Sequence, residues 1–366
     1  MIIPHCSALT WKKLYAAAES FSEIGCWDWM SDSDLFGVEN PADGEIGYCC
    51  VLGELGEAYG LVVYLGSLGL EQHRKIQSGK MTARSRDFLC SQSCLTAWFG
   101  DRGDLDDTDL KMVKALGLKF RGRDTWPQFR SLRPGYLPWY LCESEARFLA
   151  VCLEQARQVA LDFAGDPDLF DPPAKKHYLV RVPTKLSAHQ ARDKSLPPSQ
   201  PTLFPEAEQT PSYEWKDQWR APEPLVKQPV KPFPLNEIQL QRIKKTGCQY
   251  DGTWESDGFF TAQPVAGEDR PFFPYAFLCA DQDSGFIFST VLAEWKTWET
   301  EFPKAFLSGI EEHQLFPEKL RVRKKEFAEL FAPLAARLGI EIELCKRLPS
   351  VEQARRALFK FMEKRF

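Results

Sequence analysis

The run Ser195-Leu-Pro-Pro-Ser-Gln-Pro-Thr-Leu-Phe-Pro205 lies inside a proline-rich segment, residues 183–234, that holds 11 of the 26 prolines in the chain. Proline lacks a backbone N–H and fixes its own φ, so a segment this rich in proline does not favour regular helices or central strands. Its apolar residues show little periodicity. The segment therefore predicts a largely extended tether between two folded units.

The tether divides the sequence into three parts. We expect an α+β domain over residues 1–182, a proline-rich linker over 183–235 and a smaller α/β domain over 236–366. A chain of 366 residues is long enough for two domains that each bury a core. The hydrophobic share of 44% and the charged share of 27% are ordinary for globular proteins. The net charge of -5 gives no overall attraction to nucleic acid or to anionic membranes.

The sequence predicts a cytoplasmic protein without a membrane segment. Its first residues lack the basic and apolar regions of a secretory signal, and no run of about 18 apolar residues occurs. The 11 cysteines are an odd number, which favours reduced thiols over a disulfide framework. Cys90 and Cys94 are separated by three residues rather than two, and no second pair with zinc-ligand spacing follows. We therefore expect neither a metal nor another cofactor.

The first part shows the pattern of an antiparallel meander. Three β-rich runs, residues 34–39, 46–52 and 59–65, follow one another with short turn sequences between them. Further strands are expected at 88–90, 94–99 and 176–182, and helices after Ser7, at 67–76, at 106–116 and at 143–163. The fold class expected for this part is therefore α+β.

An aromatic stretch follows these strands: Trp126-Pro-Gln-Phe-Arg-Ser-Leu-Arg-Pro-Gly-Tyr-Leu-Pro-Trp-Tyr140 has five aromatic residues and three prolines. The prolines exclude a regular helix here. We favour a loop that is fastened across the core by its rings. The alternative is an aromatic groove for a peptide or a small ligand, lined by Trp126, Tyr136 and Trp139.

The tether contains one motif of its own, Gln200-Pro-Thr-Leu-Phe204. It resembles the pentapeptide by which bacterial replication and repair proteins dock on the DNA polymerase sliding clamp. In such a motif Leu203 and Phe204 would fill an apolar pocket and Gln200 would make hydrogen bonds at its edge. Pro201 departs from the aliphatic residue often found there. The alternative, which we favour, is that Leu203 and Phe204 pack on a domain, as Trp215 and Trp219 are expected to do.

The second domain has the order β-β-β-α-β-α-β-α. We expect strands within 254–265, at 275–280 and at 286–292, a helical stretch over 295–313, and then alternating strands and helices at 320–323, 325–338, 340–344 and 350–364. Three antiparallel strands followed by parallel crossovers resemble the ribonuclease H-like and integrase-core architecture. The resemblance implies a mixed sheet, and it carries no function by itself.

Active members of that fold hold metal ions with carboxylates on the first strand, near the end of the fourth strand and on a late helix. Here the expected first strand has no acid within 259–265, and the fourth ends in Arg321-Val-Arg-Lys-Lys325, whose cations would repel Mg²⁺. We therefore expect no catalytic residues. The alternative is a metal-dependent nuclease or phosphotransferase that uses Asp281, Asp283 and Glu326. Aspartates in a turn more commonly make local hydrogen bonds, so we favour the first interpretation.

The second domain is unevenly charged. Residues 236–318 hold 6 basic and 14 acidic side chains, whereas residues 319–366 hold 13 basic and 6 acidic ones. One interpretation is a phosphate-facing surface that binds nucleic acid through Arg321, Arg323, Lys324 and Lys325. The interpretation that we favour is a set of solvated helix faces.

The sequence lacks the Gly-Lys-Ser/Thr loop, the Gly-x-Gly-x-x-Gly fingerprint and the Gly-x-Ser-x-Gly elbow, which counts against nucleotide enzymes and hydrolases of that type. Several motifs are moderately specific as a set: Trp27-Asp-Trp29, residues 53–66, Pro134-Gly-Tyr-Leu-Pro-Trp139, Phe316-Pro-Glu-Lys-Leu-Arg-Val322, Leu338-Gly-Ile340 and Leu348-Pro349. Through them the chain resembles a bacterial two-domain family of unknown function, which implies architecture and no activity. The sequence as a whole predicts a non-catalytic binding or scaffold protein. A nuclease, or an accessory protein of DNA metabolism recruited by the sliding clamp, is the alternative.

Overall fold

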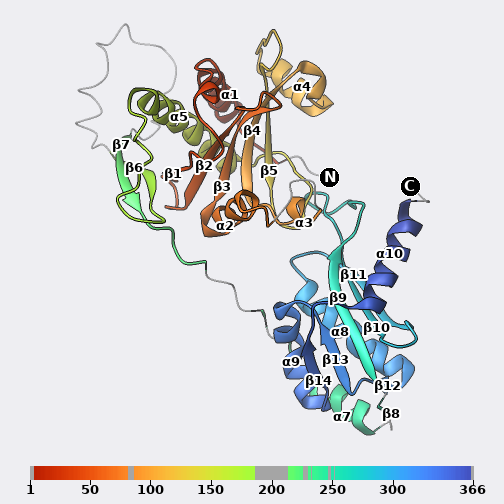
Figure 1. Ribbon diagram of the computed structural model, residues 1–366. Helices are drawn as coiled ribbons and strands as arrows, with labels where there is room; N and C mark the ends of the chain where they lie inside the picture. The colour runs from red at the N-terminus through yellow and green to blue at the C-terminus, as the bar shows by residue number, and fades with distance from the viewer. Residues whose placement is uncertain are drawn as a thin grey trace.

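Figure 1 shows the computed structural model of the protein, which describes residues 4–80, 86–185, 213–225, 230–231, 233–245, 249–250 and 252–363. Its strands form two main sheets, one of seven strands and one of five, and a separate pair of short strands within these residues. Each main sheet is the centre of its own domain, and the two domains lie one above the other in the view of Figure 1.

The sheet of the first domain has the order β5-β4-β3-β2-β1-β6-β7. Neighbouring strands are antiparallel except for β1 and β6, which run parallel. The bounds are β1 Phe36–Glu39, β2 Ile46–Leu52, β3 Tyr59–Leu65, β4 Cys94–Gly100, β5 Trp126–Leu132, β6 Tyr178–Lys185 and β7 Tyr213–Arg220. The predicted meander is confirmed, because β1, β2 and β3 occupy the three expected runs and pair in sequence order.

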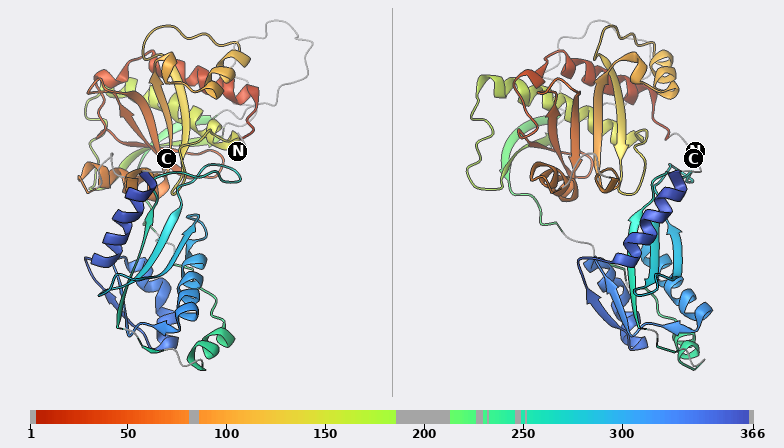
Figure 2. Two further views of the ribbon diagram at one scale, coloured as in Figure 1. Left: turned by 90° about the vertical axis from the view of Figure 1, so that its right-hand side faces the viewer. Right: turned by 45° about the vertical axis from the view of Figure 1, so that its right-hand side comes forward.

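Helices cover both faces of this sheet (Figure 2). Helices α1 (Ala8–Ser22) and α5 (Glu143–Gly165) pack on one face around a large apolar core, and α2 (Gly66–Gln77) covers the other face. Smaller elements are η1 (Cys26–Asp28), α3 (Arg86–Leu89), η2 (Arg102–Asp104) and α4 (Asp107–Ala115). Glu143 ties α5 to α1, since its carboxylate accepts hydrogen bonds from the Ser7 N–H (2.7 Å) and the Thr10 hydroxyl (2.6 Å).

Two local predictions for this domain were wrong. Residues 88–90 do not form a strand, because α3 covers most of them. Residues 126–132, expected within a loop, form strand β5, in which Pro127, Phe129 and Ser131 are buried alternately. Strand β5 lies at the edge of the sheet, where a proline costs no central ladder hydrogen bond.

The segment expected as a linker contributes to this sheet as well. Strand β6 continues to Lys185, and β7 pairs with it over eight residues as the last strand of the sheet. Trp215 and Trp219 pack against the apolar core, so the prediction that these two rings lie on a domain is confirmed. Gln200, Leu203 and Phe204 lie outside the described residues.

The second domain has a five-stranded sheet in the order β11-β10-β9-β13-β14. Its strands are β9 (Thr253–Phe260), β10 (Tyr275–Asp281), β11 (Ile287–Ala293), β13 (Lys319–Val322) and β14 (Glu341–Leu344). Strand β10 is antiparallel to both β9 and β11, whereas β13 is parallel to both β9 and β14. This is the predicted ribonuclease H-like mixed sheet.

Helices again cover both faces of this sheet. Helices α8 (Trp298–His313) and α9 (Lys325–Leu338) pack on one face around an aromatic core, and α10 (Pro349–Glu363) packs on the other. Helix α7 (Glu237–Lys245) precedes the sheet, and β8 (Gln249–Tyr250) pairs with β12 (Leu315–Phe316). The alternation of strands and helices matches the expected order.

The two domains contact each other through one loop from each (Figure 2). The Leu137 N–H donates to the Pro271 carbonyl (3.0 Å), and the Phe273 N–H donates to the Gly135 carbonyl (2.8 Å). Arg270, which is 7% exposed, donates to the Ser131 carbonyl (3.4 Å). The stretch after β5 is therefore fastened by backbone hydrogen bonds to the second domain.

Candidate functional site

Strand β9 carries two buried acids. We expected the first strand within residues 254–265, centred on Phe259 and Phe260, and found no acid within 259–265. The strand ends at Phe260, and its acids lie earlier, at Glu255 and Asp257. Side chains alternate along a strand, so Glu255, Asp257 and Phe259 share one face, which α10 covers. The exposed fractions of Glu255 and Asp257 are 0% and 1%.

Asp257 is held by two cations that directly follow β13, Arg323 and Lys324. A guanidinium N–H of Arg323 donates to Oδ2 of Asp257, and Nζ of Lys324 lies 3.8 Å from Oδ1. Arg323 also lies 3.6 Å from the carboxylate of Glu352, in the first turn of α10. Arg323 therefore bridges an acid on the first strand to an acid on the last helix.

Lys324 is fixed by contacts besides Asp257. Its ammonium donates to the Gly258 carbonyl and to the Tyr275 hydroxyl (3.0 Å), and it lies 5.3 Å from the centre of the Tyr275 ring. The Phe327 ring centre is 5.8 Å away. Gly258 leaves the space for this arrangement, since a Cβ there would lie 2.6 Å from the Phe327 ring.

Glu255 holds the start of α10. Its Oε2 accepts the backbone N–H groups of Ser350 (2.9 Å) and Val351 (3.3 Å), and its Oε1 lies 3.7 Å from Arg321. Burial raises the pKa of Glu255, although the two N–H groups and Arg321 act in the opposite direction. A carboxylate at a helix N-terminus complements the unpaired N–H groups there, so this contact orients α10 on the sheet.

The cluster is therefore a set of internal ion pairs. Glu255 and Asp257 face Arg321, Arg323 and Lys324, so the buried negative charge is compensated by side chains of the chain itself. Over the part of the chain that the structure describes, no three His, Cys, Asp or Glu side chains are arranged to hold a metal ion. The arrangement is suited to fixing β9, β13 and α10 together.

The acids proposed for the nuclease alternative lie elsewhere. Asp281 ends β10, where its carboxylate accepts the N–H (2.7 Å) and the hydroxyl (2.6 Å) of Ser284. Burial acts to raise the pKa of Asp281, but these hydrogen bonds hold it below its ordinary value. Asp281 pairs with Trp254 at the start of β9, whereas Glu326 follows the opposite end of the parallel strand β13. Asp283 lies exposed in the turn after Asp281, and the structure does not bring the three acids together.

The four cations proposed for nucleic-acid binding each have a carboxylate within 4 Å. Arg323 and Lys324 face Asp257 as described. Arg321 lies 3.8 Å from Glu343 and donates to the Gln282 side chain (2.9 Å). Lys325, 75% exposed in its side chain, pairs with Glu329 one turn along α9 at 3.5 Å.

The three residues of the proposed aromatic groove are separated by the structure. Trp126 starts β5 and lines a hollow of about 260 Å³ at that end of the sheet. Trp139 pairs with Ser131 near the other end of β5. Tyr136 pairs with Phe272 of the second domain, and the Arg270 guanidinium lies over its ring at 5.9 Å. They do not form one groove, because Tyr136 belongs to the contact between the domains.

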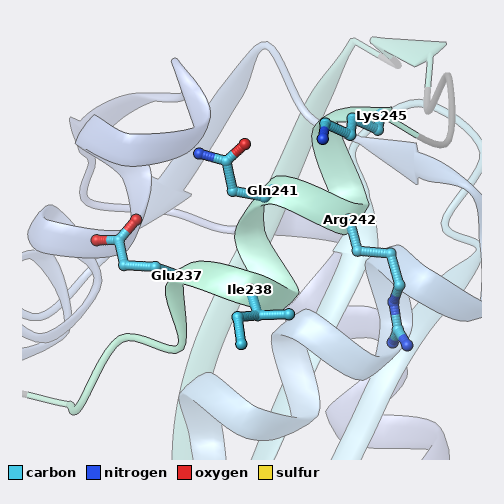
Figure 3. Close-up of a pocket in the computed structure, with 5 residues that line it drawn as sticks. All are labelled: Glu237, Ile238, Gln241, Arg242 and Lys245. Carbon is cyan, nitrogen blue, oxygen red and sulfur yellow. The ribbon is translucent and has the colours of Figure 1, made fainter.

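A wider hollow of about 580 Å³ lies along α7. Its lining is Glu237, Ile238, Gln241, Arg242 and Lys245, and Figure 3 shows these side chains spread along one helix and pointing in different directions. Arg242 is already paired with Glu311. The hollow therefore has no convergent polar groups that would orient a ligand.

Comparisons with known proteins concern the domains and the fold. Residues 11–181 match the family model Domain of unknown function (DUF7309), and residues 239–359 match Domain of unknown function (DUF6930). Similar solved structures are the trimeric and dimeric forms of the HTLV-2 integrase catalytic core domain in complex with magnesium. Each is 17% identical over 32% of this chain, with a TM-score of 0.24, and the match covers 73% of the trimeric-form chain and 74% of the dimeric-form chain. At this level the likeness says nothing about activity.

No curated protein matches the sequence. A helix with the length and apolarity to cross a membrane is not found among the helices that the structure describes.

Proposed function

We propose that the protein is a non-catalytic binding or scaffold protein whose ribonuclease H-like domain serves as a structural support. The observation that carries this proposal is the position of Arg323 and Lys324 on the buried carboxylate of Asp257. Active members of this fold carry a metal-binding acid on the first strand, and here the acid on that strand is occupied by cations of the chain.

Electrostatics gives the physical reason. A Mg²⁺ ion on Oδ1 of Asp257 would lie close to Nζ of Lys324, which is 3.8 Å from that oxygen. Two unit charges about 4 Å apart interact by about 4 kcal/mol at an effective dielectric constant of 20, and a divalent ion about doubles this repulsion. Binding of the metal would therefore require both cations to leave Asp257.

A metal-dependent nuclease or phosphotransferase is the second candidate. Oδ1 of Asp257 is buried and has no hydrogen-bond partner among the described residues, and Glu352 lies near it on the other side of Arg323. The Arg323 side chain is 32% exposed, so rotation toward solvent would leave Asp257 and Glu352 without the cation between them. This alternative uses Asp257 and Glu352 rather than Asp281, Asp283 and Glu326.

In the experiment, the full chain is incubated with Mg²⁺ or Mn²⁺ and with single-stranded DNA, double-stranded DNA, RNA or a DNA–RNA hybrid, and cleavage of each nucleic acid is measured. We compare wild type with Asp257→Asn and with Asp281→Asn, a control that removes the acid at the end of β10. We expect no cleavage that depends on Asp257. Turnover that is lost in Asp257→Asn and kept in Asp281→Asn would overturn the proposal and support the nuclease.

A protein partner that docks on Gln200, Leu203 and Phe204 would be consistent with a binding role. Capture of the sliding clamp by wild type, compared with a Leu203→Ala, Phe204→Ala double variant, tests it; equal capture by both removes this partner. Nucleic-acid binding through Arg321, Arg323, Lys324 and Lys325 would require phosphates to compete with the carboxylates that already face these cations.

A further inference from the structure

The hollow of about 260 Å³ at the end of β3, β4 and β5 combines aromatic walls with an acidic rim. Its lining includes the aromatic residues Tyr59, Trp98, Phe99 and Trp126. Its acids are Glu57, Asp104 and Asp124, all three exposed. The volume lies below the range of about 300–1,000 Å³ that is typical of sites for drug-sized ligands. It suits one side chain better than a nucleotide.

Two glycines lie opposite the tryptophans of this hollow. Gly60 pairs with Trp98 across β3 and β4, and Gly100 pairs with Trp126 across β4 and β5. A Cβ on Gly60 would lie 2.7 Å from the Trp98 ring, so the ring rests against the bare backbone of β3. A Cβ on Gly100 would lie 2.7 Å from the Asp104 carboxylate, so the two glycines let the Trp98 ring and the Asp104 side chain pack against bare backbone.

The walls are fixed before any ligand binds. The Trp27 ring backs Tyr59 at 4.9 Å between ring centres, and the Phe120 ring contacts Trp126 at 5.7 Å. The Gln128 amide, which also lines the hollow, donates to the Asp104 carbonyl (3.1 Å). Rigid walls lower the entropy that binding would cost.

The charge of the hollow selects a cation. Within the described ranges no Lys, Arg or His lies at ion-pair distance from Glu57 or Asp124, and neither carboxylate accepts a hydrogen bond there. The chain already places one guanidinium against a ring of the hollow, since Arg102 lies over the Trp126 ring at 6.0 Å. An indole face attracts a guanidinium through its quadrupole. The Trp126 ring therefore already makes a cation–π contact within the protein.

We propose that this hollow binds an organic cation of the guanidinium or ammonium class, presented as an arginine or lysine side chain or as a free amine. The rings of Trp98 and Trp126 would contact the cation, and Glu57 and Asp124 would supply the opposite charge. Arg102 occupies the Trp126 face and competes with the ligand. The inference rests on the proposed binding function and adds the chemistry of the partner.

The experiment follows the tryptophan indole N–H signals of the full ¹⁵N-labelled chain by NMR. The probes are acetyl-Gly-Arg-Gly-amide, the same peptide with neutral citrulline in place of arginine, and ethylguanidinium. Trp98→Phe and Trp126→Phe assign the two signals. We expect a saturable shift of both signals with the arginine peptide and none with the citrulline peptide.

Charge variants make the test specific. Glu57→Gln combined with Asp124→Asn is expected to weaken binding by roughly 2- to 30-fold at low salt, because each exposed charge pair contributes little. The control combines Glu54→Gln and Asp107→Asn, which change the net charge equally outside the hollow and are expected to leave the affinity unchanged. Arg102→Ala is expected to tighten binding, which a purely structural effect of Arg102 would not do.

Three results would overturn the inference: no binding of the arginine peptide, equal binding of the citrulline peptide, or equal weakening in the two double variants. Tighter binding of the peptide than of ethylguanidinium points to a protein partner, and equal binding points to a free amine; both keep the cation site. A nuclease activity that depends on Asp257 would end the proposed function without changing these titrations, because Asp257 lies in the other domain.

Discussion

Replacing Gly135 with alanine is expected to loosen the contact between the two domains. Gly135 has φ +82°, and its carbonyl accepts the Phe273 N–H of the second domain at 2.8 Å. A Cβ on Gly135 would lie 2.5 Å from the Cβ of Trp295, which is closer than two non-bonded carbon atoms can approach. The rigid base of Trp295 cannot give way as a flexible side-chain end can, so the loops must move apart.

The magnitude has two parts that a control separates. An alanine in the left-handed region costs about 1–2 kcal/mol, and forcing a methyl group into a packed contact costs about 1–3 kcal/mol. Gly44 has φ +81° and no atom within 4 Å of the place where an added methyl group would lie, so Gly44→Ala carries only the first part. The difference between the two variants, about 1–3 kcal/mol, is the cost assigned to the domain contact.

Native-state hydrogen exchange measures this cost directly. The amides of Leu137 and Phe273 make the hydrogen bonds between the domains, and they exchange when the contact opens. At about 1.4 kcal/mol per factor of ten, Gly135→Ala is expected to speed their exchange by roughly 5- to 150-fold. Gly44→Ala is expected to leave both amides unchanged. Equal exchange in wild type and Gly135→Ala would refute the contact.

Three further predictions concern stability. Arg323→Ala leaves the carboxylate of Asp257 with less compensation and is expected to destabilise the second domain by about 3–5 kcal/mol in urea unfolding, with much of the loss recovered when Asp257→Asn is added; no recovery would exclude the ion pair as the cause. Gly258→Ala places a methyl group 2.6 Å from an aromatic ring and is expected to cost about 1–3 kcal/mol, whereas Gly103→Ala, with no atom within 4 Å, is expected to be nearly neutral in the same urea titration. Burial acts to raise the pKa of Glu143, but hydrogen bonds from the start of α1 lower it to about 2. Its contribution is therefore complete above the unfolded pKa of about 4.3 and lost as the pH falls toward 2. Thermal unfolding should show wild type and Glu143→Gln differing at pH 7 and converging near pH 2, and a constant difference would contradict the pKa shift.

Elements with a strong local period were predictable from the sequence. Strands β2 and β3 fill the expected runs, and α9 covers the expected residues 325–338. Strand β5 was not predictable in this way, because its prolines and aromatic residues look like a loop. Its strand geometry comes from pairing with β4 along its whole length, a long-range interaction that local propensity does not contain.

The buried site was missed for a related reason. The sequence Trp254-Glu-Ser-Asp-Gly-Phe-Phe260 has polar residues where a buried strand normally has apolar ones, so we centred the strand on the phenylalanines. The buried charges of Glu255 and Asp257 are compensated by cations from β13 and the residues directly after it and by N–H groups at the start of α10, and Arg323 lies 66 residues away from Asp257 in the sequence. The available signal was the alternation of Glu255, Asp257 and Phe259, which places two acids on one face of a strand.

The uneven charge of the second domain and its buried acids are connected. The acidic part, residues 236–318, and the basic part, residues 319–366, face each other in the fold: Arg321 lies near Glu255, Arg323 pairs with Asp257, and Arg337 pairs with Glu237 at 3.1 Å. A basic surface that binds phosphate would leave its cations available to solvent and ligand. Cations that instead meet carboxylates from the other half of the domain favour a role in holding β13 and α9 against the elements that precede them.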